Sequence, residues 1–306
     1  MRLVRIRGES MSLTTRIVFF GLIGILAGIL TWPFAELILY YQASFPTLLL
    51  FNIALGITVG LFMGACFGTS EGIIAASKVK IRTGIATGVI AGIIGGIIGF
   101  VAGQAALLFL GTTFFHSTYG FQKIGFPVSK AVGWATFGMC AGMAHGIRRQ
   151  AGSKIRNGII GGFIGGFLGG LAVEYIKVLS PGNVYARLVG LMVLGLLIGI
   201  FYGIIENKLA KASLLLLNGK YKDREFLLTQ RLTNIGRSPK TEVGLSGYNN
   251  VADVHTIIKK EKDDFVLTDA GSKNGTLIND DKTGRVKLRN GDVIRIGDAQ
   301  FIFRKK

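Results

Sequence analysis

The chain has 306 residues, of which half are hydrophobic and 45 are glycine, and its formal net charge is +18. Soluble globular chains carry about 7% glycine and about 25% charged residues, whereas this one has about 15% glycine and 17% charged residues. Residues 1–212 hold 17 Lys/Arg, 5 Glu and no Asp, and residues 213–306 hold 18 Lys/Arg and 12 Asp/Glu. The composition excludes a single soluble enzyme and predicts a membrane part followed by a soluble part.

Residues that would hold a metal or perform catalysis are sparse. The three histidines lie far apart in sequence, and both cysteines sit in apolar runs. No CxxC, HExxH, P-loop or dinucleotide-binding motif is present, and these are the usual signs of metal, nucleotide or redox sites. We therefore expect no enzyme activity, no metal and no cofactor.

Six segments are long and apolar enough to cross a bilayer core of about 30 Å, which needs about 20 residues per helix. They run approximately over residues 17–41, 45–70, 81–110, 127–147, 157–178 and 184–205. The predicted membrane domain thus occupies residues 17–206, after a basic arm at residues 1–16 and before a short linker at residues 207–212.

Basic residues predict the orientation of these helices, because Lys and Arg are enriched in cytoplasmic loops. Thirteen of the 17 basic residues in residues 1–212 fall on one side of the predicted spans. We therefore expect both termini in the cytoplasm of a multi-pass plasma membrane protein. The compact fusion and sparse low-complexity sequence favour a bacterial or archaeal cell. The charge serves orientation, so no nucleic-acid partner is expected.

The glycines follow an internal repeat. An offset of 74 places Gly64, Gly68 and Gly72 onto Gly138, Gly142 and Gly146, and it carries Gly88, Gly92 and Gly96 onto Gly162, Gly166 and Gly170. Gly195, Gly199 and Gly203 form a further copy of the first set, and Gly24 and Gly28 a weaker copy of the second. The pattern predicts three direct repeats of a helical hairpin. Glycine at every fourth position lets helices approach closely in lipid.

Two interpretations of this glycine-rich domain stay open. One is a tight bundle that carries no cargo, contacts membrane lipids, and uses its small-residue stripes internally or in a homo-oligomer. The other is a channel or transporter with a polar site in the membrane, for which Glu36, Gln104 and Glu174 are the candidates. Ionisable groups in a membrane are costly and usually functional.

From residue 213 the hydrophobic pattern changes to short alternating segments, typical of strands. Nine strands are predicted; they are 213–217, 225–228, 233–235, 243–245, 255–259, 265–268, 276–278, 293–296 and 300–303. Turn sequences such as Asn274–Gly275 and Asn290–Gly291 separate them. Residues 213–306 should therefore form an all-β sandwich or barrel.

Four blocks in this part carry a family resemblance. They are Ile235–Gly236–Arg237–Ser238, His255, the run from Asp269 to Thr276 and the run from Asn290 to Gly297. In this order and spacing they resemble a forkhead-associated (FHA) domain, whereas the membrane part resembles no family we recognise. The resemblance covers less than a third of the chain and implies an eleven-stranded sandwich whose loops at one end bind a phosphothreonine peptide.

The resemblance also implies roles for single residues. Arg237 would contact the phosphopeptide and Asn274 would hold the peptide backbone, with Ser238, Ser272 and Lys273 on the same two loops. Gly236, His255 and Gly275 would shape the loops. Charge-assisted donors on rigid loops, and an arginine fork above all, suit a phosphate dianion.

One block departs from the family pattern. FHA domains usually carry Ser-Arg-x-His, whereas this chain has Ala252–Asp253–Val254–His255. At these positions a bound phosphate would have neither the hydroxyl donor nor the cation of the family pattern. It would lie near a carboxylate, and this proximity of like charges is unfavourable. Asn249, Asn250 or Lys240 are the neighbours that could compensate. Phosphothreonine binding and a phosphate-independent surface on the same loops therefore both stay open.

Together these observations predict a multi-domain protein: an all-α polytopic membrane bundle of six helices in three hairpin repeats, then an all-β FHA-like sandwich. The function that fits best is a membrane-anchored signalling adaptor whose cytoplasmic FHA domain binds a protein partner, either through phosphothreonine or without phosphate. The alternatives are a channel or transporter regulated by the FHA domain, and a structural scaffold.

Overall fold

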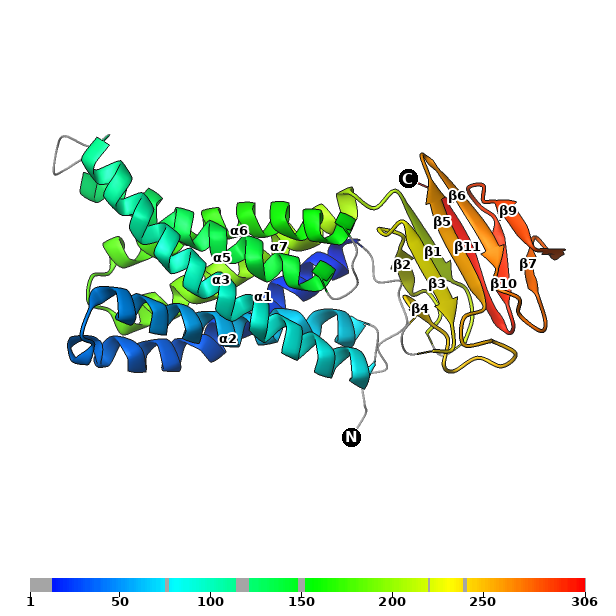
Figure 1. Cartoon of the computed structure of the whole chain (residues 1–306), viewed down its shortest axis with the longest axis horizontal. Coiled ribbons are helices and arrows are strands. Elements are labelled where there is room, and N and C mark those ends of the chain that lie inside the picture. The colour runs from blue at the N-terminus through cyan, green and yellow to red at the C-terminus, as the bar shows by residue number, and fades with distance from the viewer. Residues whose placement is uncertain are drawn as a thin grey trace. The chain divides into compact units, whose positions relative to one another are not determined.

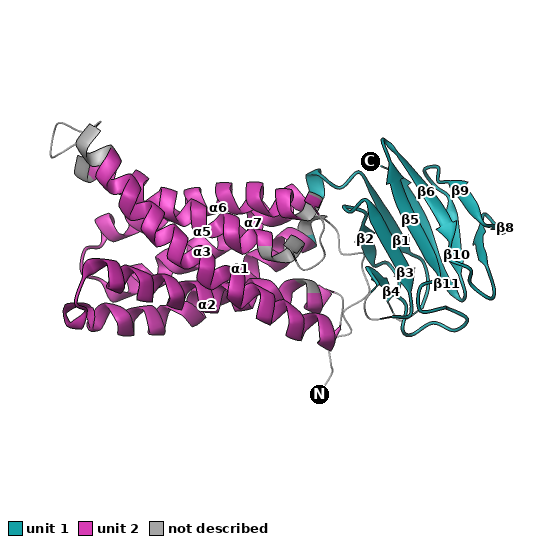
Figure 2. Cartoon of the chain, in the orientation of Figure 1, with its two compact units in different colours: residues 1–15, 207–306 teal, residues 16–206 magenta. Residues whose placement is uncertain are grey.

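The computed structural model describes residues 13–74, 77–113, 121–147, 152–219, 221–238 and 241–305 (Figure 1). The chain divides into a helical unit, residues 16–206, and a unit built on residues 207–306 (Figure 2). The change from helices to strands falls where the hydrophobic pattern changes. Leu209–Lys211 connect the last helix to the first strand.

The helical unit contains the six expected long helices. They are α1 (Leu13–Tyr40), α2 (Leu48–Ile74), α3 (Lys78–Thr113), α5 (Phe126–Ile147), α6 (Gly152–Leu179) and α7 (Val184–Lys208). A short 3-10 helix, η1 (Gln42–Ser44), and a π-helical turn, η2 (Phe121–Gly125), lie between them.

Five of these helices, all except α5, are long and apolar enough to span a membrane, within the described residues. We expected six spans. α5 is rich in Gly and Ala and contains Lys130, and small residues contribute less hydropathy than Leu or Ile. Its sequence therefore carries a weaker membrane signal than that of its neighbours.

The glycine stripes pack helices into close antiparallel pairs, two of which are related by the sequence repeat. A Cβ built on Gly64 of α2 would lie 2.2 Å from the carbonyl oxygen of Gly88 on α3. One on Gly138 of α5 would lie 2.1 Å from that of Gly162 on α6. Both contacts are related by the 74-residue offset, so the sequence repeat is also a repeat of contacts. Any side chain at these positions would force the backbones apart.

The remaining contacts close the six helices into a ring. Gly99 packs on Gly133 between α3 and α5, and Gly165 packs on Ile198 between α6 and α7. α7 then returns onto α1, where a Cβ on Gly195 would lie 2.0 Å from the oxygen of Gly24. α1 and α2 meet through stacked Phe34 and Phe62 rings with centroids 4.3 Å apart. Each helix therefore contacts the next in chain order, and the last contacts the first.

The second unit is a sandwich of two sheets. Its strands are β1 (Ala212–Leu216), β2 (Glu225–Leu227), β3 (Leu232–Gly236), β4 (Val243–Gly244), β5 (Thr256–Glu261), β6 (Asp264–Asp269), β7 (Thr276–Ile278), β8 (Asp281–Thr283), β9 (Arg285–Lys287), β10 (Val293–Ile296) and β11 (Ala299–Lys305). The six-stranded sheet has the order β2-β1-β11-β10-β7-β8 and the five-stranded sheet β4-β3-β5-β6-β9. The nine expected strands are present, and β8 and β9 are additional.

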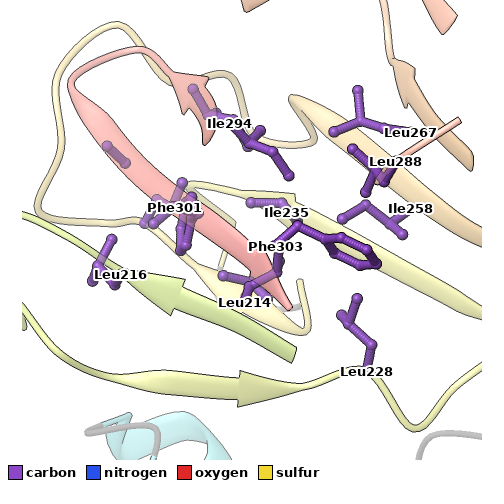
Figure 3. Packing of buried hydrophobic residues seen from close by; sticks show 14 of the residues in the cluster. Leu214, Leu216, Leu228, Ile235, Ile258, Leu267, Leu288, Ile294, Phe301 and Phe303 are labelled. Atoms are coloured by element: carbon purple, nitrogen blue, oxygen red, sulfur yellow. The ribbon is translucent and has the colours of Figure 1, made fainter. Parts of the chain in front are cut away.

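The core of the sandwich follows from alternation along the strands. On β11, Ala299, Phe301 and Phe303 are buried, and the residues between them are less so. Phe301 and Phe303 face residues of the opposite sheet such as Ile235 and Ile258 (Figure 3). This apolar cluster is drawn entirely from residues 212–303, so the unit holds a complete core of its own.

Candidate phosphopeptide-binding site

Three loops meet at one end of the sandwich: residues 237–242 after β3, residues 245–255 before β5, and residues 270–275 after β6. Backbone hydrogen bonds join the first two. Arg237 N donates to Ala252 O at 2.9 Å, and Ser238 N donates to Asp253 O at 3.1 Å. A Cβ on Gly236 would lie 2.2 Å from the same Asp253 oxygen, so only glycine fits this approach.

His255 joins the second loop to the third. Its ring is buried, with 1% exposure; Nδ1 accepts a hydrogen bond from Ala252 N at 3.1 Å, and Nε2 lies 3.2 Å from Gly275 O. Because Nδ1 accepts and Gly275 O can only accept, the proton sits on Nε2. Gly275 itself has a φ of +76°, a conformation that favours glycine. The histidine therefore holds two loops together and is not placed for catalysis.

Asp269 holds the third loop in shape. Its carboxylate accepts hydrogen bonds from Gly271 N, Ser272 N, Ser272 Oγ and Thr276 Oγ1 at 2.7–2.9 Å. Burial raises the pKa of this carboxyl, but the bonds from Thr276, Ser272 and Gly271 outweigh burial and bring the pKa below its usual value. The loop is thus built around an ionised aspartate.

The expected peptide-binding residues fall into two groups. Arg237 and Lys273 are exposed, and within the described residues their side chains make no hydrogen bond or ion pair. Asn274 is also exposed, and its Nδ2 donates to Asn250 O at 3.4 Å across the gap between two loops. The Ser272 hydroxyl, in contrast, donates to Asp269 and accepts from Gly275 N. Ser238 is partly buried.

The loop that departs from the family pattern presents its carboxylate to solvent. Asp253 is exposed and Ala252 is partly exposed, and no hydrogen bond to the Asp253 carboxylate occurs among the described residues. Of the neighbours that could compensate, Lys240 lies outside the described residues. Asn249 O accepts from Asp298 N at 3.3 Å, and Asn250 has a φ of +58°. Arg237 and Lys273 therefore share this end of the sandwich with the exposed Asp253 carboxylate.

The three polar residues expected within the membrane separate in the structure. Glu36 and Glu174 line one cavity of the helical unit, and Gln104 does not. Glu36 accepts two hydrogen bonds from Arg187, at 2.5 and 2.7 Å, and Glu174 pairs with Lys177 at 2.9 Å.

Sequence reasoning missed some residues that shape these sites. Asp269 begins the third of the four blocks, where no role was predicted for it, although an acidic residue two positions before a glycine is a common signal of a side-chain-stabilised turn. Thr241 is buried, and its Oγ1 donates to Ser238 O at 2.7 Å. Nothing in its sequence neighbourhood indicates this contact. Arg187, the partner of Glu36, lies 151 residues away.

Comparisons with known proteins agree with this geometry. The model of the FHA domain family matches residues 233–297, and no family model matches the helical unit. The glycogen accumulation regulator GarA of Mycobacterium tuberculosis is 33% identical over 92 residues, which are 30% of this chain and 56% of the relative. The chain thus spans little more than half of that protein's length.

In two further comparisons, the matched region makes up a larger share of the similar protein. The oxoglutarate dehydrogenase inhibitor of Corynebacterium glutamicum is 31% identical over 99 residues, 32% of this chain and 68% of the relative. A solved structure of the FhaA FHA domain is 30% identical and covers 30% of this chain and 99% of its own, with a TM-score of 0.29. With the loops described above and the match over residues 233–297, the chain belongs to the FHA-domain family.

Proposed function

We propose that this protein is a membrane-anchored signalling adaptor whose FHA domain lies in the cytoplasm and binds a partner protein phosphorylated on threonine. The observation that carries the proposal is the pair of exposed cations, Arg237 and Lys273, on loops fixed by His255 and Asp269. Neither cation is engaged elsewhere among the described residues, so both side chains are available to a ligand.

The chemistry of the loop end suits a phosphorylated peptide. A phosphate carries about two negative charges and accepts several hydrogen bonds, which the Arg237 guanidinium can donate in pairs. Asn274, beside the cations, has an amide that can donate to and accept from a peptide backbone. Loops already ordered by buried hydrogen bonds lose little entropy on binding.

A second candidate keeps the same surface but not the phosphate. The exposed Asp253 carboxylate stands where the family has a cation, and it favours a partner that presents a basic group there. The oxoglutarate dehydrogenase inhibitor of the corynebacteria acts, by its name, on another protein. A protein partner without phosphate would be consistent with that kind of role.

Binding of matched peptides separates the two candidates. The full-length chain in neutral detergent should bind members of a peptide library that contain phosphothreonine at least about tenfold more tightly than the same peptides with threonine, a difference of about 1.4 kcal/mol. Arg237→Ala should remove this preference. Arg289→Ala, at the opposite end of the sandwich, should retain it. Equal binding of both peptide forms would support the phosphate-independent surface, and no peptide binding at all would contradict both.

The membrane anchor is the second half of the proposal. Five helices have the length and hydropathy of membrane spans. α5 packs along α6 from Gly138 against Gly162 to Gly142 against Gly158, so we count it as a sixth span. An even number of spans leaves both ends of the chain on the same side, and the basic residues favour the cytoplasm.

A further inference from the structure

The helical unit contains a cavity of about 210 Å³ lined by residues of all six helices. It lies toward the end of the bundle where α1 and α6 finish and α5 and α7 begin, because Glu36, Glu174, Lys130 and Arg187 are all within two turns of these helix ends. A water molecule occupies about 30 Å³ in the liquid. The cavity therefore has the scale of a small organic group.

The charged residues of the cavity occupy equivalent positions of the repeat. Glu36 and Glu174 each follow a stripe glycine, Gly28 and Gly166, by eight residues. Phe100 follows Gly92 in the same way, so it stands where the other two copies have glutamate. All three residues line the cavity.

The cations also lie at equivalent positions of the repeat, on the partner helices. Arg187 precedes Gly195 by eight residues, and Lys130 precedes Gly138 by eight. The corresponding residue before Gly64 is Gly56. Two glycine-packed helix pairs, α1 with α7 and α5 with α6, thus bring a glutamate and a cation to the cavity. The third pair, α2 with α3, has Gly56 and Phe100 at the equivalent positions and brings no charged residue to the cavity.

The two glutamates of the cavity form different ion pairs. Arg187 and Glu36 form a two-point ion pair. Glu174 instead pairs with Lys177 on its own helix at 2.9 Å. Lys130 has no carboxylate within 4.0 Å among the described residues, and its Nζ lies 5.6 Å from the Phe126 ring centroid. The cavity therefore holds three cations and two carboxylates, and Lys130 shares the charge of Glu174 with Lys177.

The sector formed by α2 and α3 is apolar with one amide. Phe51, Leu55 and Phe100 line it. Asn52 is 6% exposed, and within the described residues no hydrogen bond reaches its side-chain amide. A buried amide without a partner is unfavourable, and so is an excess of positive charge at membrane depth. Both groups suit a polar, anionic ligand.

We propose that this cavity binds a small amphiphilic anion, with its carboxylate or phosphate at Lys130 and its apolar body along Phe100 and Leu55. Asn52 supplies a neutral donor and acceptor beside that body. The anion is either a free solute or the headgroup of a membrane lipid, since both offer the same chemistry. The site is separate from the phosphopeptide surface, and its occupancy can be measured independently of it.

Tryptophan fluorescence provides the test, because the chain has two tryptophans and Trp134 lines the cavity. Trp32→Phe leaves Trp134 as the reporter in the full-length chain in neutral detergent. Bromine quenches tryptophan fluorescence on contact, so bound 11-bromoundecanoate should quench Trp134 in a saturable manner. Its affinity from this titration should be at least about fivefold higher than that of 11-bromoundecanol. Lys130→Met should lower the affinity for the carboxylate at least about tenfold and leave the affinity for the alcohol unchanged. Lys123→Met removes a charge at the same end but outside the cavity, and it should have no effect.

A bilayer experiment distinguishes the two sources of the anion. Trp134 quenching is compared in vesicles of brominated phosphatidylcholine with and without brominated phosphatidylglycerol. If the ligand is a lipid, phosphatidylglycerol should increase the quenching, and Lys130→Met should abolish that increase. Quenching by the carboxylate in detergent, without a phosphatidylglycerol effect, identifies a free solute. If neither anion quenches more than its neutral counterpart, or if Lys130→Met changes neither, the proposal is wrong. The circular dichroism of Lys130→Met, unchanged from the parent, excludes misfolding as the cause.

Discussion

At the scale of single residues, the loop end of the FHA domain combines a family framework with one reversed charge. Gly236, His255 and Gly275 stand where the sequence resemblance expects loop-shaping residues, and their contacts join three loops. Asp253 faces solvent where the family has a basic residue. The loop-shaping residues fix the positions of the loops, whereas Asp253 changes the charge that the loops present.

Reversing Asp253 tests that distinction. Ala252→Ser combined with Asp253→Arg should raise the affinity for phosphothreonine peptides by about tenfold or more, because it adds a hydroxyl and replaces a repelling charge with an attracting one. Isothermal titration of the parent and the variant with one peptide measures the change. Asp281→Arg makes the same charge change on β8 and serves as the control. Equal affinities in all three proteins would remove Asp253 from the binding surface.

Asp269 predicts how the domain responds to acid. Its pKa lies below the usual value of 3.8, so as the pH falls below about 4 the unfolded chain takes up a proton before the folded chain does. The stability that the ionised carboxylate provides is present above that pH and is lost as the pH passes down through the folded pKa. Asp269→Asn should therefore lower the free energy of unfolding by about 1–3 kcal/mol at pH 7, and by clearly less at pH 2.5.

Urea unfolding of residues 207–306 measures this effect, since that unit holds its own core. Asp281→Asn, an exposed residue on β8, is the matched control and should change stability little at either pH. A loss for Asp269→Asn that does not depend on pH would show that the carboxylate acts through packing alone.

At the scale of elements, the sequence pattern predicted the elements whose periodicity is strong. The six helices and nine of the eleven strands follow from apolar period or alternation. β8 and β9 were missed because they are short and consist mostly of polar, exposed residues at sheet edges, such as Asp281, Lys282 and Arg285. They are strands through their backbone pairing with β7 and β6, and that information does not appear in hydrophobicity.

The glycine-packed helix pairs lead to a prediction about side-chain volume. Gly138→Ala places a methyl group 2.1 Å from the backbone oxygen of Gly162, so α5 and α6 must separate, at a cost typical of overpacking, about 1–3 kcal/mol. Gly152→Ala, at the start of α6, meets no atom within 4 Å and should be neutral or slightly stabilising. Thermal unfolding of the full-length chain in one detergent, followed by circular dichroism, compares the two. A midpoint for Gly138→Ala at or above that of Gly152→Ala would contradict the packing argument.

At the scale of the whole molecule, the number of spans determines the path of the chain through the membrane. With six spans and the proposed cytoplasmic N-terminus, residues 180 and 246 would lie on opposite sides, with residue 246 in the cytoplasm. If α5 did not cross, both would exchange sides, because every later segment inverts. The sequence analysis predicted six spans, but hydropathy separates α5 from the other five helices, whereas packing joins α5 to them.

Cysteine labelling resolves the path directly. The two native cysteines, Cys66 and Cys140, are first replaced by alanine. In intact cells, a membrane-impermeant maleimide should then label Ser180→Cys and should leave Ser246→Cys unlabelled until the membrane is opened. Exchange of the two labelling patterns would indicate five spans, and labelling of both or neither would contradict either count.

Closure of the ring between α1 and α7 also sets an order of events during synthesis. Gly24 can pack only after Gly195 has been synthesised, and Glu36 can pair only after Arg187. The first helix therefore enters the bilayer about 170 residues before its partner. At about 5–20 residues per second, the delay is roughly 9–34 seconds. Throughout that interval the stripe of α1 and its carboxylate are open to other helices or to an insertion chaperone. Completion of the bundle thus coincides with the emergence of the FHA domain from the ribosome.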